Sequence, residues 1–133
     1  MRAAGWVALA FYCVAIGVQV AVRTGAIPVT SIAGGYLPSL EAHLPVFVMN
    51  VVVSAIGVVF VVLASGIGGE RNAGWYRIAG WTLTVYWTAG FLMQLIGTDF
   101  ERTYLAWLAL IGALAHLRIA VRNPAKAPAA VSH

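Results

Sequence analysis

Charged residues are scarce in this sequence, and cysteine is nearly absent. Asp, Glu, Lys and Arg together make up 9% of the 133 residues, against about 25% in an average soluble domain. The single cysteine, Cys13, excludes an internal disulfide and a cysteine-based metal cluster, and its place in an apolar run predicts a packing role. The four acidic residues and three histidines are too scattered for a metal site. We therefore expect neither a metal ion nor a cofactor.

Apolar residues are what the sequence has in abundance. Hydrophobic side chains account for 62% of the chain, more than a small water-soluble domain could hide from solvent. The formal net charge is +4, but the basic residues are spread along the chain rather than clustered, which argues against nucleic acid as a partner. The composition predicts an all-α integral membrane protein, with the lipid bilayer as its first partner.

Long uncharged runs predict four membrane-spanning helices. Residues 3–22, 44–69 and 78–98 carry no charged side chain, and about 20 apolar residues suffice to cross a bilayer core of roughly 30 Å. The first run is long for the core of a signal peptide and precedes three further spans, so we interpret it as a helix that stays in the protein. The predicted spans are 3–22, 44–65, 75–96 and 99–121, forming one transmembrane domain over residues 1–122. Residues 66–72 are expected to form a polar turn and 123–133 a disordered cytoplasmic tail.

The third and fourth spans are predicted to form a tight antiparallel hairpin. Gly97 suits the left-handed residue that closes many helices. Thr98 and Glu101 have the spacing of a capping box, in which the hydroxyl and the carboxylate satisfy free N–H groups of the next helix. Because the helix-ending Gly97 directly precedes the helix-starting cap at Thr98, almost no loop is expected between the two helices.

The longest connection, residues 24–43, is apolar although glycines and prolines break any helix in it. It is therefore expected to lie on the membrane surface or to fold back onto the bundle. The second span has two candidate starts, a cap at Ser39 with Glu41 in the first turn, or a first turn at Pro45. The sequence leaves both open.

The basic residues predict that both termini lie in the cytoplasm, as expected for a protein of the bacterial cytoplasmic membrane. In that orientation six basic residues fall on the cytoplasmic side and two, Arg23 and Arg102, on the other. This split agrees with the positive-inside rule. The cytoplasmic set is Arg2, Arg71, Arg77, Arg118, Arg122 and Lys126.

Three side-chain amides are expected at similar depth in the outer third of the membrane. Gln19, Asn50 and Gln94 each lie one or two helical turns from the outer end of their spans, judged from a rise of about 1.5 Å per residue. Charged or titratable residues are predicted above them, namely Arg23, Glu41, His43, Asp99, Glu101 and Arg102. Convergent faces would form an outward-facing polar vestibule for a small-molecule or lipid ligand. Alternatively, the amides hold the bundle together by hydrogen bonds between helices.

The remaining polar residues give weaker signals. His43, Asn50, Ser54 and Gly57 recur at steps of seven, four and three, which places them on one helix face. His43 and His116 are expected at opposite ends of the bundle, so they cannot clamp one haem, and His116 is interpreted as a hydrogen-bonding or interfacial residue. Arg102 is expected to pair with Glu101 or with Glu41.

Three classes of function follow. The first is a non-enzymatic accessory or binding module that packs with a membrane partner or with itself, since no charge is buried within a span and small residues recur at helical spacing. The second is a small oligomeric transporter or channel that uses the polar vestibule. The third is an enzyme acting on a lipid or quinone. The sequence favours them in that order and assigns no catalytic residue.

Overall fold

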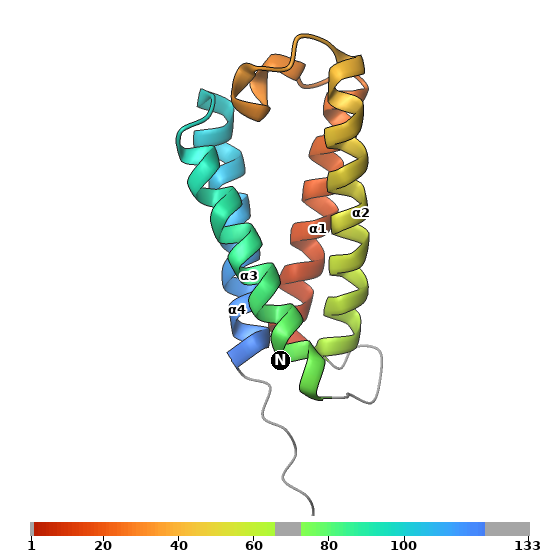
Figure 1. Ribbon diagram of the computed structural model, residues 1–133, viewed down its shortest axis with the longest axis vertical. Coiled ribbons are helices and arrows are strands. Elements are labelled where there is room, and N and C mark those ends of the chain that lie inside the picture. Colours follow the sequence, from red (N-terminus) through yellow and green to blue (C-terminus); the bar gives the residue numbers. More distant parts are fainter. Residues whose placement is uncertain (1, 66–72, 122–133) are drawn as a thin grey trace, which may run out of the picture.

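Four long helices form the structure of this protein. The computed structural model describes residues 2–65 and 73–121, so the predicted turn at 66–72 and the predicted tail at 123–133 lie outside the described residues. The helices are α1 (Arg2–Arg23), α2 (Leu40–Ala64), α3 (Ala73–Leu95) and α4 (Ala106–Val121), and α4 is preceded by a π-helical turn, η3 (Glu101–Leu105). Successive helices run in opposite directions, up and down the long axis (Figure 1).

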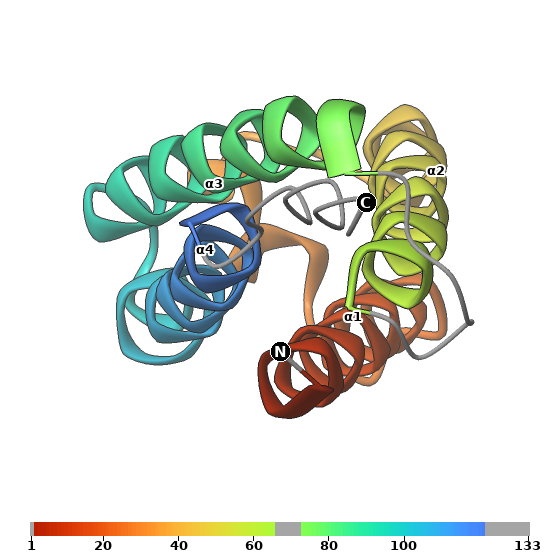
Figure 2. The ribbon, with the colours of Figure 1, turned by 90° about the horizontal axis from the view of Figure 1, so that it is seen from below.

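The helices are arranged as two pairs that meet at one end of the molecule. α1 packs on α2, α3 packs on α4, and the two pairs are joined mainly by contacts between α1 and α4, whereas α2 and α3 have few contacts. Figure 1 shows the pairs close together at the end that holds the N-terminus and further apart at the opposite end. Seen along the long axis, α2 and α3 form one side of the bundle (Figure 2).

Small residues allow the close approach of α4 to its neighbours. A Cβ atom placed on Gly80 of α3 would lie 2.9 Å from the Cβ of Ala120, and one on Gly112 of α4 would lie 2.7 Å from the Phe11 ring of α1. Ala109 and Ala113 are buried on α4. Such surfaces let helix backbones approach closely, which increases the van der Waals contact between the helices.

The start of α2 is set by Ser39. The Ser39 hydroxyl accepts a hydrogen bond from the Ala42 N–H at 3.2 Å, and Glu41 lies in the first turn, near the positive end of the helix dipole. Pro45 lies inside the helix. The structure thus selects Ser39 from the two predicted starts.

The predicted capping box joins α3 to the next helix. The Thr98 N–H donates to Glu101 Oε2 at 2.8 Å, and the Glu101 N–H donates to Thr98 Oγ1 at 3.2 Å. The left-handed conformation predicted for Gly97 is wrong, since the positive-φ glycines of the described chain are Gly25, Gly34 and Gly35. Gly97 instead leaves room for Glu101, because a Cβ atom there would collide with the Glu101 carboxylate.

Residues 24–39, here called the strap, fold back onto the bundle and connect the two helix pairs where they are furthest apart (Figure 1). The strap contains two short 3-10 turns, η1 (Val29–Ser31) and η2 (Ala33–Gly35). Thr98 Oγ1 donates to the Ser31 carbonyl at 2.5 Å, and the Gly34 N–H donates to Glu101 Oε2 at 3.0 Å. The strap therefore folds back onto the bundle, which is one of the two arrangements expected for this apolar connection.

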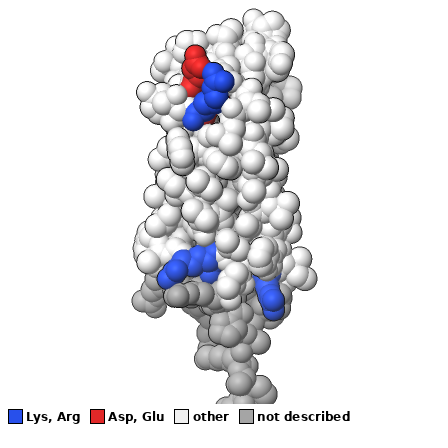
Figure 3. Space-filling view, turned by 90° about the vertical axis from the view of Figure 1, so that its left-hand side faces the viewer, with Lys and Arg blue, Asp and Glu red and all other residues white. Residues whose placement is uncertain are grey.

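Three helices are long and apolar enough to cross a membrane: Ala3–Arg23, Leu40–Ala64 and Glu101–Val121. This finding fits a membrane location. α3 was predicted as a further span but falls outside this set, because tryptophan, tyrosine, threonine and glutamine side chains interrupt its apolar residues. On the face shown in Figure 3, charged side chains lie near the two ends of the molecule, with an uncharged region between them.

Cys13 is exposed on α1. The prediction that it packs inside the protein is therefore wrong. Its neighbours in sequence explain the error: Phe11 and Tyr12 are buried, and at about 100° per residue the helix turns Cys13 away from the core.

Candidate functional site

The three predicted amides, Gln19, Asn50 and Gln94, line one cavity between the helix pairs. The cavity has a volume of about 60 Å³ and lies between α1, α2, α3 and the fourth helix. Ser54 and the Trp87 indole also line it, and its apolar wall includes Phe11, Leu105, Leu108 and Ala109. We call this space the amide cavity. The convergence of the three helix faces is a fact of the structure, whereas ligand binding by these residues stays a prediction.

Two of the amides are partly engaged by hydrogen bonds. Gln19 Oε1 lies 3.1 Å from His43 Nε2, so the ring N–H donates to the amide oxygen, and the Asn50 Nδ2 donates to the Val46 carbonyl at 3.0 Å. The Gln94 side-chain oxygen is different, because it is buried and has no hydrogen-bond partner. A buried acceptor without a partner costs about 1–3 kcal/mol. Gln94 is therefore the least satisfied group at the cavity.

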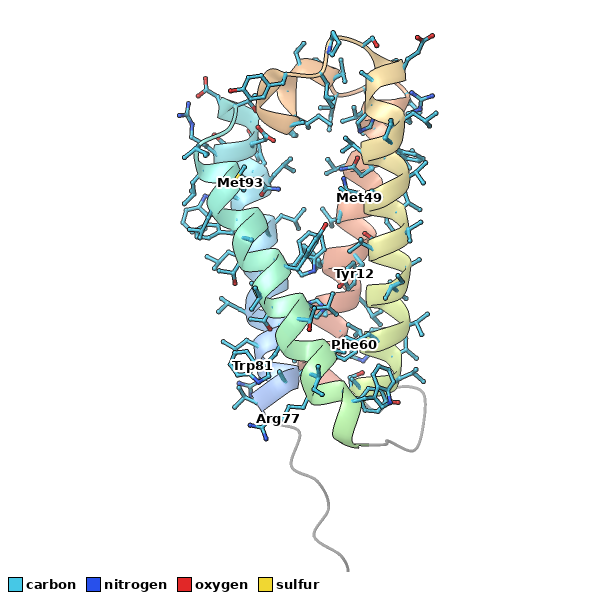
Figure 4. The ribbon with its side chains drawn as sticks, viewed as in Figure 1. Tyr12, Met49, Phe60, Arg77, Trp81 and Met93 are labelled. Carbon is cyan, nitrogen blue, oxygen red and sulfur yellow. The ribbon has the colours of Figure 1, made fainter. Side chains whose placement is uncertain are left out.

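A chain of hydrogen bonds begins at the wall of the amide cavity and runs into the core. The Trp87 indole N–H donates to the Tyr12 hydroxyl at 3.3 Å, Tyr12 Oη lies 2.9 Å from His116 Nε2, and His116 Nδ1 lies 2.6 Å from the Gly112 carbonyl. Tyr12 and His116 are fully buried. Figure 4 shows Tyr12 and Phe60 between the two helix pairs.

The donor and the acceptor of each hydrogen bond follow from the two end groups, the Trp87 indole and the Gly112 carbonyl. An indole N–H can only donate and a carbonyl can only accept, so the Tyr12 hydroxyl donates to His116 Nε2 and the proton of a neutral His116 is on Nδ1. The ring of Phe60 stacks on His116 with centroids 6.0 Å apart. His116 thus forms a hydrogen bond between helices, as predicted. Sequence reasoning missed Trp87, because nothing in the residue spacing showed that its indole would reach Tyr12.

The charged residues predicted above the amides do not line the amide cavity. Arg23 donates to the Leu40 carbonyl at 2.6 Å and so connects α1 to the start of α2. Arg102 pairs with Asp99, one turn earlier, and not with Glu101 or Glu41 as expected. Glu101 holds the strap and the capping box. These side chains have local structural partners, and their predicted role in ligand binding remains untested.

The amide cavity has hydrogen-bonding groups but lacks the parts of a nucleophilic site. Ser54 lines it, yet no histidine or carboxylate of the described chain does, and a serine nucleophile needs such a base within hydrogen-bond reach. Across residues 2–65 and 73–121 there is no group of three or more His, Cys, Asp or Glu side chains that could hold a metal ion. The polar groups that line the cavity can form hydrogen bonds with a ligand.

A second space lies between α2 and α3, where those helices have few contacts. It has a volume of about 750 Å³ and is lined almost entirely by apolar groups. We call it the α2–α3 groove. Its lining comprises Ala55, Ile56, Val59 and Phe60 from α2 and Trp75, Ile78, Ala79, Thr82 and Leu83 from α3.

Comparison of this chain with known protein families, with curated proteins and with solved structures gave no match.

Proposed function

We propose that this protein is a non-enzymatic integral membrane module that associates with a second copy of itself through the α2–α3 groove. The observation that carries the proposal is the groove itself. The other neighbouring helix pairs pack against each other, whereas α2 and α3 leave a wide apolar space between them. A transmembrane helix fills such a space with more van der Waals contact than mobile lipid chains can provide.

The exposed surface of α2 suits a partner of the same kind. Large apolar side chains follow one another along α2 at steps of three and four, and each is between 36% and 62% exposed: Met49, Val52, Ile56, Val59 and Leu63. This is the spacing of a helix–helix seam. Ile56 and Val59 also line the groove. A two-fold interface uses the same patch on both subunits, so the patch must be complementary to itself. The ridge of large side chains on α2 beside the groove meets this requirement.

The proposed location is a bacterial cytoplasmic membrane with both termini on the cytoplasmic side. Its support is the charge distribution: the apolar helices carry their charged residues near their ends, and the predicted cytoplasmic side holds six of the eight basic residues. In this orientation the strap faces away from the cytoplasm.

The experiment compares two matched tryptophan substitutions in lipid vesicles. Val59 of the groove is 58% exposed, and Val85 of α3, which does not line the groove, is 64% exposed. Counting subunits by single-molecule photobleaching should show dimers for the wild type and for Val85→Trp. Val59→Trp, which overfills the interface, should shift the population to monomers.

Two outcomes would contradict the proposal. One is a monomeric wild type at all protein-to-lipid ratios, and the other is equal dissociation of both tryptophan variants. Purification from the native membrane supplies an independent control. If a second polypeptide co-purifies at a fixed ratio and is lost in Val59→Trp but not in Val85→Trp, the groove binds a different membrane protein and not a second copy.

A further inference from the structure

We propose that the amide cavity is a binding site for a small, uncharged molecule that carries an N–H or O–H donor, such as a primary amide. This inference does not depend on self-association, because the amide cavity and the α2–α3 groove share no lining residue.

The lining of the amide cavity selects against ions. Its polar members are Gln19, Asn50, Ser54, Trp87 and Gln94, and no charged side chain is among them. An ion in an apolar protein interior needs an opposite charge or several strong ligands to offset the loss of its hydration. A neutral polar molecule needs only hydrogen bonds, which amide and hydroxyl groups supply.

Gln94 lines the amide cavity and offers an unpartnered acceptor to a donor on the ligand. Its buried side-chain oxygen has no partner, and unsatisfied groups of this kind mark positions where a ligand or an ordered water completes the structure. Gln19 and Asn50 use one group each for His43 and for the Val46 carbonyl. These bonds leave the amide nitrogen of Gln19 and the amide oxygen of Asn50 uncommitted. A molecule with both a donor and an acceptor therefore matches the site.

The volume limits the ligand to a few atoms. A cavity of about 60 Å³ holds roughly four to six water-sized probes, taking 10–15 Å³ for each. Sites for drug-sized ligands are several times larger. Acetamide, with four non-hydrogen atoms, is a suitable probe, and acetate has the same heavy-atom shape but carries a negative charge in place of the N–H donors.

The test measures binding to the full chain in lipid nanodiscs by saturation-transfer NMR, observing the methyl group of each probe. We expect saturable binding of acetamide above the signal from empty nanodiscs and no saturable binding of acetate. Gln94→Met removes the acceptor at similar size and should weaken acetamide binding about three- to tenfold. Thr88→Val, on the same helix but outside both the amide cavity and the α2–α3 groove, should leave it unchanged.

Several outcomes would overturn the proposal. They are an acetamide signal no greater than that of empty nanodiscs, acetate binding as strong as acetamide binding, and equal effects of Gln94→Met and Thr88→Val. Circular dichroism and thermal melting establish that Gln94→Met folds, which we expect because it removes an unsatisfied acceptor. Val59→Trp should still bind acetamide, which separates this site from the proposed interface.

Discussion

At the scale of single residues, Tyr12 is the centre of the buried polar chain. Its hydroxyl accepts from Trp87 and donates to His116, and so connects α1 to both helices of the other pair. In an apolar interior each of these groups would otherwise lack a partner. These hydrogen bonds stabilise the region where the two helix pairs meet. This region lies next to the amide cavity, whose wall includes Trp87.

Tyr12→Phe should therefore destabilise the fold without changing its shape. The substitution leaves His116 Nε2 and the Trp87 N–H without partners, and we expect a loss of about 1–2 kcal/mol in the free energy of unfolding. This loss is measured by unfolding the protein in mixed detergent micelles and monitoring its tryptophan fluorescence. In a double-mutant cycle with His116→Phe the two losses should be strongly non-additive, and simple additivity would count against a shared hydrogen bond.

Two glycines offer a second, matched prediction. A Cβ atom on Gly57 would collide with the Tyr12 hydroxyl and ring, whereas one on Gly17 has nothing within 4 Å. Gly57→Ala should lower the free energy of unfolding by about 1–3 kcal/mol, because Tyr12 is fully buried and cannot move aside. Gly17→Ala should be neutral or stabilise the helix by up to about 1 kcal/mol. The same detergent titration compares them, and equal effects would refute the packing argument.

At the scale of elements, the strap and the turn between α3 and η3 form one unit. Glu101 Oε2 accepts from the Thr98 N–H and from the Gly34 N–H, so one carboxylate both caps a helix and holds the strap. Thr98 contributes a second tie through its hydroxyl to Ser31. The strap thus joins the two helix pairs at the end where their helices are furthest apart (Figure 1).

Glu101→Ala should release the strap. We expect amide hydrogen exchange at Gly34 and Thr98 to speed up at least about tenfold, because both N–H groups lose their acceptor. Asp99→Ala is the matched control. Its carboxylate is 93% exposed and pairs with Arg102, and exposed ion pairs contribute little. Similar exchange rates in the two variants would show that Glu101 does not hold the strap.

At the scale of the whole molecule, the bundle is closed along three seams and open along the fourth. Contacts between α1 and α2, α1 and α4, and α3 and α4 bury small and aromatic residues, while α2 and α3 enclose the apolar groove. The strap covers one end of the bundle, and Arg77 lies near the other (Figure 4). The loosely packed side between α2 and α3 supports the proposed interface, and the uneven distribution of charge supports the proposed orientation.

The orientation yields a topology prediction. With both termini in the cytoplasm, a cysteine introduced at Tyr36, which is 89% exposed in the strap, should react with a membrane-impermeant maleimide in intact cells. The background is Cys13→Ser, and a cysteine in the 66–72 segment should react only after the membrane is permeabilised. The reverse pattern would place the termini outside and contradict the positive-inside assignment.

The helices and their ends were largely predictable, because their signals are local. The uncharged runs located α1, α2 and α3 within a few residues, and Thr98–Glu101 predicted a capping box that the structure contains. Gly97 shows the limit of such signals. A glycine after a helix suggests a left-handed residue, but here it is needed for the Glu101 side chain that turns back toward it.

The sequence by itself determined an all-helical, strongly apolar chain and the depth of Gln19, Asn50 and Gln94 along their helices, since length, hydrophobicity and helical rise are properties of each segment alone. Only the tertiary structure decided that these amides line one cavity, that Trp87 reaches Tyr12, and that α2 and α3 leave a groove. The rotation of each helix about its axis and the spacing between helices come from packing against neighbours distant in sequence, which no local pattern specifies.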